Sequence, residues 1–188
     1  MRRKLLLVVV MLLLLGGEWL AAASSTTEAA QATVGEQNAL VAVRRMSAEI
    51  VRLEEKTWRW ERLMGLPRTQ TKGRVLTQMH VEDVREALTL WRRRAQAAVR
   101  RAQTPPHLRS WLCIHRYEGT WKDAGAPFYG GLQMDISFQR RYGGRLLRTK
   151  GTADHWTPLE QIWVAERALR AGRGFYPWPN TARSCGLI

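Results

Sequence analysis

The chain has 188 residues, 45% of them hydrophobic, and a formal net charge of +14. This length allows one ordinary domain with additions or two small domains, and two cysteines are too few for a cysteine-based zinc site. The strong positive charge predicts an anionic partner, either nucleic acid or an anionic cell envelope.

The N-terminus predicts export. Arg2–Lys4 are basic, Leu5–Leu15 form an unbroken apolar run, and Ala21–Ala23 supply a small-residue cleavage pattern. This order predicts a cleaved signal peptide over residues 1–23 and a protein that is secreted or associated with the cell wall. The alternative is an uncleaved membrane anchor, although the apolar run is short against the roughly 20 residues that span a bilayer.

The expected export changes the predicted net charge and the interpretation of the two cysteines. Cleavage lowers the net charge to +12, because it removes three basic residues and one acidic residue. In an exported protein this charge favours anionic envelope polymers or a membrane surface over nucleic acid. Cys113 and Cys185 then form an even pair, which predicts one disulfide rather than two free thiols. That bond closes a loop of about 70 residues, worth roughly 4 kcal/mol in the chain-entropy model.

Residues 24–36 are rich in Ser, Thr, Ala and Gln and predict a flexible spacer. The next region, 37–106, predicts two amphipathic helices, Gln37–Met64 and Val81–Ala102, each with apolar residues at alternating steps of three and four. The expected seam residues are Val43, Met46, Ile50, Leu53, Trp60 and Met64 in the first helix, and Val81, Val84, Leu88, Trp91, Ala95, Ala98 and Ala102 in the second.

The connection between the two helices leaves two arrangements open. They form either an antiparallel hairpin or a stalk docked on the C-terminal segment. The arginines of Arg92–Arg94 and Arg100–Arg101 lie largely off the seam. They form either a solvated basic face or a contact with anionic wall polymer or phospholipid headgroups.

Thr104-Pro105-Pro106 marks a boundary, with Thr104 expected as the N-cap of the next helix. In that helix Leu108, Trp111, Leu112 and His115 share a stripe, and Glu118 continues it before Gly119 ends the helix. We therefore expect Glu118 on the core-facing side at a helix C-terminus. Burial and the negative end of the helix dipole both disfavour a carboxylate there.

A carboxylic acid kept neutral can protonate a glycosidic oxygen, so Glu118 is the candidate proton donor of a glycosidase. A buried structural glutamate is the alternative. Glu166 lies on a similar stripe and is interpreted as structural, paired with an arginine. No zinc-ligand spacing is present among the histidines, and neither a metal nor a cofactor is predicted.

Further motifs lie in the last 60 residues. Asp135 is expected to cap a short helix that runs to about Tyr142, and Thr157-Pro158-Leu159-Glu160 is a capping box that opens a helix ending at Gly172. The aromatic stretch Gly174–Pro179 can stack on sugar rings or fill a small core, and the residues alone do not decide between these roles.

The ordered set of motifs resembles the transglycosylase-like domain of actinobacterial resuscitation-promoting factors, over His107–Ile188. The pieces that carry the resemblance are Cys113, the Glu-Gly-x-Trp of Glu118–Trp121, the Tyr-Gly-Gly-Leu-Gln of Tyr129–Gln133, the Glu-Gln-Ile-x-Val-Ala-Glu-Arg of Glu160–Arg167, the Gly-x-x-x-Trp-Pro of Gly174–Pro179, and Cys185-Gly186.

The resemblance implies a mainly α, small lysozyme-like catalytic domain closed by a Cys113–Cys185 disulfide. It implies Glu118 as the single catalytic glutamate, and it implies a substrate cleft lined by Trp121, Tyr129, Gln133 and Trp178. The family usually places its glutamate directly after the first cysteine, where this chain has Ile114. Glu118 lies four residues later, about one helical turn, so it keeps nearly the same face. The family also tends to have a Thr-Trp pair where this chain has Phe138-Gln139.

The sequence thus predicts a secreted peptidoglycan-cleaving glycosidase that cuts the glycan strand between its amino sugars. If Glu118 activates the substrate's own 6-hydroxyl, the product is a 1,6-anhydro sugar, and if it activates water, the enzyme is a lysozyme. Two other functions stay open: an inactive wall-binding module, and a secreted polyanion or nucleic-acid binder that uses the arginine-rich helices.

Overall fold

The computed structural model describes residues 34–71 and 79–188, and this part of the chain is mainly helical. The expected signal peptide, the alternative membrane anchor and nearly all of the expected spacer lie outside the described residues. None of the helices within the two described ranges is long and apolar enough to cross a membrane. The chain divides into two compact units, one with residues 1–49 and 74–88 and one with residues 50–73 and 89–188.

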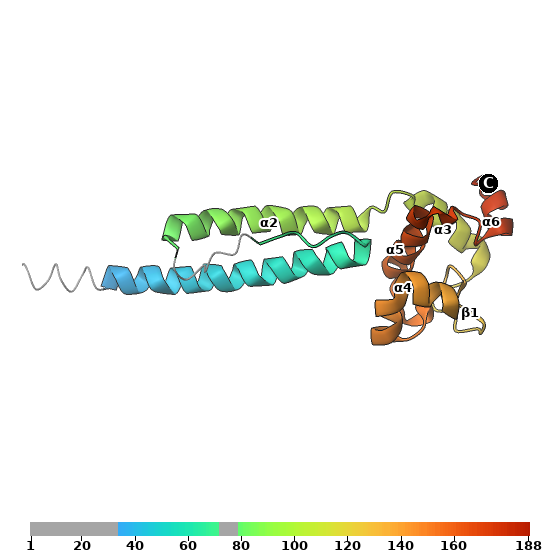
Figure 1. Cartoon of the computed structure of the whole chain (residues 1–188), viewed down its shortest axis with the longest axis horizontal. Helices are drawn as coiled ribbons and strands as arrows, with labels where there is room; N and C mark the ends of the chain where they lie inside the picture. The colour runs from blue at the N-terminus through green and yellow to red at the C-terminus, as the bar shows by residue number, and fades with distance from the viewer. Residues whose placement is uncertain (1–33, 72–78) are drawn as a thin grey trace, which may run out of the picture. The chain divides into compact units, whose positions relative to one another are not determined.

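Both amphipathic helices are present with the expected seams. Within the described residues the first is helical over 34–64, which includes the last three residues of the segment expected as spacer, and the second is α2, Val81–Gln103 (Figure 1). Of the predicted seam residues, Val43, Ile50 and Met64 are buried in the first helix and Val84, Leu88, Trp91, Ala95, Ala98 and Ala102 in α2, whereas Met46, Leu53, Trp60 and Val81 are half-buried. The 3.6-residue period therefore located the helices and their buried faces correctly.

The expected antiparallel hairpin is wrong, because the two helices run in the same direction. Within the second unit, Trp58 meets Trp91 edge to face at 6.2 Å between ring centroids, and Met64 and Ala102 belong to one buried cluster. The two helices are therefore parallel (Figure 1).

The start of the connection explains how a parallel pair forms. After Gly65 the chain turns back, so that the Trp58 indole N–H donates to the carbonyl oxygen of Thr69 at 3.0 Å and the Thr69 N–H donates to Glu61 at 2.9 Å. At about 3.3 Å per extended residue, a connection of this length can return along a helix that rises 1.5 Å per residue. Short connections favour antiparallel neighbours, and this one is not short.

The remaining elements form a small helical fold with a two-stranded sheet (Figure 1). They are α3 (Leu108–Glu118), β1 (Phe128–Tyr129), β2 (Met134–Asp135), α4 (Ile136–Lys150), the 3-10 turn η2 (Ala153–His155), α5 (Pro158–Ala168), the π-helical turn η3 (Leu169–Arg173) and α6 (Pro179–Ser184). The strands are antiparallel and pair Phe128 with Asp135 and Tyr129 with Met134. The core holds Trp111, Ile114, Leu132, Met134, Ala153, Trp156, Ile162, Val164, Ala165 and Trp178.

Local capping chemistry sets the starts of α4 and α5 as expected. The Asp135 carboxylate accepts a hydrogen bond from the Phe138 N–H at 2.7 Å, and Thr157 and Glu160 form a complete capping box. However, α4 continues to Lys150, beyond the expected end near Tyr142. Gly143 stays helical and lets Trp156 pack against the helix, because a Cβ there would lie 2.6 Å from the Trp156 ring.

The start of α3 differs from the expectation. Thr104 is not its N-cap, since the Thr104 hydroxyl donates to the carbonyl of Arg100 at the end of α2, and His107 takes the N-cap position without a side-chain cap. The buried face of α3 holds Trp111 and Ile114, whereas Leu112 is 46% exposed. The buried stripe is thus rotated around the helix from the predicted one.

The ends of the two long helices belong to the same compact unit as the small helical fold. Trp163 of α5 donates its indole N–H to the carbonyl of Ala102 at 2.7 Å. Arg167 donates to the carbonyl of Leu63 at 2.5 Å, and Arg170 donates to that of Met64. These contacts satisfy carbonyl groups at two helix C-termini, which have no partner within their own helix. The described residues 50–71 and 89–188 thus belong to one compact unit.

Candidate functional site

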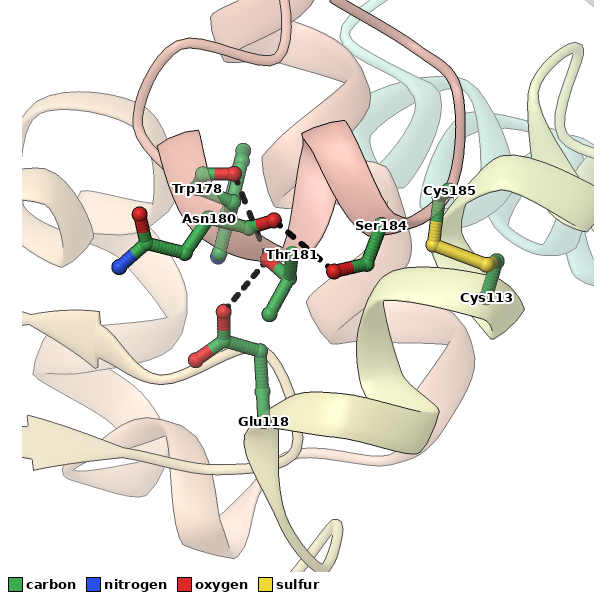
Figure 2. Close-up of a disulfide and its surroundings, with 7 residues drawn as sticks. All are labelled: Cys113, Glu118, Trp178, Asn180, Thr181, Ser184 and Cys185. Carbon is green, nitrogen blue, oxygen red and sulfur yellow. Dashed lines mark hydrogen bonds between the residues drawn. A yellow bond between two sulfur atoms is a disulfide. The ribbon is translucent and has the colours of Figure 1, made fainter.

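Glu118 is the last residue of α3, as predicted, and it is half-buried rather than fully buried. Its position follows from the rotation of the buried face, which places Trp111 and Ile114 inside and leaves Glu118 at the border of the core. Gly119 ends the helix with a φ of 144° and turns the chain away. The carboxylate points toward α6 (Figure 2).

Thr181 of α6 is the partner of Glu118. Its hydroxyl donates to Oε1 of Glu118 at 2.7 Å, and Oε2 accepts no hydrogen bond from residues 34–71 or 79–188. The bond joins residues 63 positions apart in the chain, and no sequence pattern indicated it. One carboxylate oxygen is therefore fixed in direction, and the other is left for a ligand or solvent.

The predicted disulfide between Cys113 and Cys185 is confirmed. The two sulfur atoms lie 2.04 Å apart and the two Cα atoms 6.0 Å apart. Cys113 lies five residues before Glu118 on α3, and Cys185 is the C-cap of α6 (Figure 2). Because the bond joins these two helices, it also holds Thr181 in place against Glu118.

A second polar pair lies next to the helix end. Gln133, which has a φ of 44°, donates from Nε2 to Oδ2 of Asp123 at 2.7 Å, and the Gly125 N–H donates to Oδ1 of Asp123 at 2.9 Å. A Cβ on Gly119 would lie 3.2 Å from Asp123 Oδ2 and 3.4 Å from Gln133 Nε2, so the pair packs directly on the residue after Glu118. Glu118 with Thr181, and Asp123 with Gln133, are thus two hydrogen-bonded pairs at the C-terminal end of α3, and together they are called the cluster around Glu118.

The Gly130-Gly131 pair is required by close packing. A Cβ on Gly130 would lie 2.5 Å from Oε1 of Gln161, and one on Gly131 would lie 2.5 Å from Nδ1 of His115. The Gly131 N–H donates to Gln161 Oε1 at 2.8 Å. These glycines thus allow a close approach to protein side chains, which fixes the turn that carries Gln133.

Gln161 is fully buried and ties this turn to two other segments. Besides accepting from Gly131, its amide group donates to the carbonyls of Trp121 at 2.9 Å and Ala153 at 2.8 Å. A buried amide with this many partners is well satisfied and rigid. A glutamine among the apolar residues of α5 was the available sign of this role.

The aromatic residues predicted for the cleft lie in different environments. Trp121 is half-buried and stacks on His115, with ring centroids 3.8 Å apart, and Tyr129 is half-buried in β1. Trp178 is only 4% exposed, lies in the core, and donates its indole N–H to the carbonyl of Leu132 at 2.6 Å. Trp178 is therefore a core residue, and almost none of its ring is accessible to a sugar.

Glu166 is buried and structural, but its expected arginine partner is wrong. Its Oε1 accepts hydrogen bonds from the His107 backbone N–H and from the Trp111 indole N–H, each at 2.9 Å. The His107 ring lies 3.2 Å from Oε2. Glu166 thus takes the place of a cap for the first turn of α3.

Comparison of the chain with protein families, curated proteins and solved structures found no match. Within the described parts of the chain, no three His, Cys, Asp or Glu side chains gather into a group that could hold a metal ion. The function must therefore be argued from the cluster around Glu118 itself.

Proposed function

We propose that the segment His107–Ile188 cleaves the glycan strand of peptidoglycan, with Glu118 as the proton donor. The observation that carries the proposal is a half-buried carboxyl group with one oxygen held by Thr181 and the other without a partner among the described residues. A general acid needs this combination of fixed direction and an accessible oxygen within hydrogen-bond reach of the leaving group.

The surroundings of Glu118 favour a mechanism with one catalytic glutamate. Asp123 is the other carboxylate of the cluster, and both of its oxygens already accept hydrogen bonds, from Gln133 and from Gly125. Its role is then to hold Gln133 rather than to attack the sugar or activate water. In this mechanism Glu118 protonates the glycosidic oxygen, and its carboxylate then takes a proton from the 6-hydroxyl of the same sugar or from water.

The substrate contacts come from the rim of the cluster. Half-buried Trp121 can contact a sugar ring, and the Tyr129 hydroxyl and the Gln133 amide oxygen can bond sugar hydroxyl or acetamido groups. The net charge of +12 expected after removal of residues 1–23 draws such a protein to an anionic cell wall.

The test is digestion of purified peptidoglycan by the mature protein, followed by mass spectrometry of the soluble products. Fragments that end in a 1,6-anhydro sugar support the intramolecular route, and fragments with a reducing end support hydrolysis. If wild-type protein binds peptidoglycan and releases neither product, the glycosidase proposal fails and the segment is a wall-binding module.

A further inference from the structure

We propose that a cavity between the helix of residues 34–64, α4 and α5 binds a small amphiphile with one anionic head group and an apolar body, such as an alkyl phosphate. The cavity measures about 700 Å³ and lies within the second compact unit. This volume is in the range of pockets that enclose a small organic ligand. It shares no lining residue with the cluster around Glu118, so the proposal does not rest on the proposed function.

The rim of the cavity is cationic. Arg59, Arg62 and Arg145 line it, are exposed, and form no ion pair with any carboxylate of the described residues. The cavity's only acidic lining residue, Glu160, is already bound by Lys150 at 2.6 Å. Helix α4 adds to the positive charge around the cavity, since it carries five basic residues and no acidic one. The site therefore offers unpaired positive charge to an anion.

Two further groups line the cavity: the half-buried cation of Arg167 and an indole N–H without an acceptor in the described part of the chain. The Arg167 side chain donates to the carbonyls of Tyr142 and Leu63, not to a carboxylate. Burial, with a smaller contribution from the charge of Arg170, lowers the pKa of Arg167 to about 10, so the group is still charged at neutral pH. Trp60 also lines the cavity, and its buried indole N–H has no acceptor among the described residues.

The walls of the cavity are largely apolar and can contact the hydrocarbon part of the ligand. Half-buried Leu63, Leu146 and Leu159 line the cavity together with the rings of Trp60 and Tyr142. Inorganic phosphate would leave these walls in contact with water, and a neutral alkyl compound would leave the arginines unused. A single ligand that carries both an anionic group and a hydrocarbon portion satisfies both parts of the site.

The test measures binding of dodecyl phosphate to the full mature protein by calorimetry, below the concentration at which the compound forms micelles. We expect saturable binding that is at least about tenfold tighter than that of inorganic phosphate, which lacks the tail, and of dodecyl maltoside, which has the tail but an uncharged head group. Substitution of Arg62→Gln together with Arg145→Gln should weaken binding by about tenfold or more. The control Arg140→Gln removes an exposed charge from α4 outside the cavity and should leave binding unchanged.

Binding to lipid vesicles distinguishes a membrane lipid from a free amphiphile as the ligand. Sedimentation with phosphatidylglycerol vesicles that depends on Arg62 and Arg145 supports a membrane lipid as the occupant. Dodecyl phosphate binding without vesicle binding supports a free amphiphile. The proposal is overturned if dodecyl phosphate binds no more tightly than inorganic phosphate, or if Arg140→Gln weakens binding as much as the double variant. Neither result bears on cleavage by Glu118.

Discussion

The contact between Thr181 and Glu118 carries a direct prediction for catalysis. Valine in place of Thr181 keeps the shape of the side chain but removes the hydroxyl that donates to Oε1. We expect Thr181→Val to lower kcat on soluble peptidoglycan fragments by about tenfold, equivalent to about 1.4 kcal/mol, with little change in KM.

Thr181→Ser is the matched control, because it restores the hydroxyl and should recover most of the activity. Equal loss of kcat in the serine and valine variants, or a fall in melting temperature that parallels the fall in kcat, would show that Thr181 acts only in folding.

Any side chain at Gly131 should lower the stability of the fold. A Cβ there would lie 2.5 Å from His115 Nδ1 and 2.8 Å from the Trp121 ring, and these two rings are stacked on each other. We expect Gly131→Ala to lower the free energy of unfolding by about 1 to 3 kcal/mol, measured by urea denaturation.

Gly144→Ala provides the opposite control. It lies within α4, and its Cβ would meet only Arg148, at 3.6 Å, so alanine should stabilise by about 0.5 to 1 kcal/mol. The assignment of Gly131 to close packing is contradicted if the two variants have the same stability.

At the scale of elements, the N-cap of α4 makes stability depend on pH. Hydrogen bonds from the Ser137 hydroxyl and the Phe138 N–H hold the pKa of Asp135 below its usual value. A lowered folded-state pKa contributes stability that is present above the unfolded pKa, near 4, and is lost as the pH falls through the folded value. We expect unfolding free energies measured below about pH 4 to fall less steeply in Asp135→Asn than in wild type.

Asparagine still caps a helix, so Asp135→Asn should retain most of the stability at neutral pH, whereas Asp135→Ala should lose about 1 kcal/mol there. An acid response of Asp135→Asn equal to that of wild type would mean that other carboxylates, such as the Lys150-bound Glu160, account for all of it.

The features that were predictable at this scale are local ones. The seams of the two long helices and the caps at Asp135 and Thr157 each depend on residues a few positions apart. The hydrogen bond between Glu118 and Thr181 and the Gln161 contacts join residues 63 and up to 40 positions apart, so no local pattern could indicate them. The half-burial of Glu118 was also missed, because the buried face of α3 is set by the elements that pack against it.

At the scale of the whole molecule, the direction of the second long helix was the main feature that the sequence did not reveal. Helix periodicity identifies a buried face but carries no information about the direction of its neighbour. The contacts that join the helix ends to the small helical fold, from Trp163 to Ala102 and from Arg167 to Leu63, depend on the completed fold. The disulfide was predictable because export is expected from the N-terminal sequence and two cysteines have only one possible pairing.

The disulfide should matter for both stability and activity. It closes a loop between residues 72 positions apart, and for such a loop chain entropy predicts a loss of about 4 kcal/mol when both cysteines are replaced by alanine. We expect a matching decrease in the free energy of unfolding. Below the melting temperature, we expect lower glycan cleavage, since α6 carries Thr181. Unchanged cleavage at low temperature would show that packing alone holds α6 in place.

Catalysis by Glu118 can be decided with a single substitution, Glu118→Gln. The measurement compares release of soluble fragments from purified peptidoglycan by wild type, Glu118→Gln and the control Glu82→Gln, which changes an exposed glutamate of α2, with sedimentation of each protein on the same peptidoglycan. We expect Glu118→Gln to bind peptidoglycan as wild type does but to lose at least about a hundredfold in fragment release, while Glu82→Gln matches wild type. Fragment release by Glu118→Gln at the wild-type rate would show that Glu118 is not the proton donor.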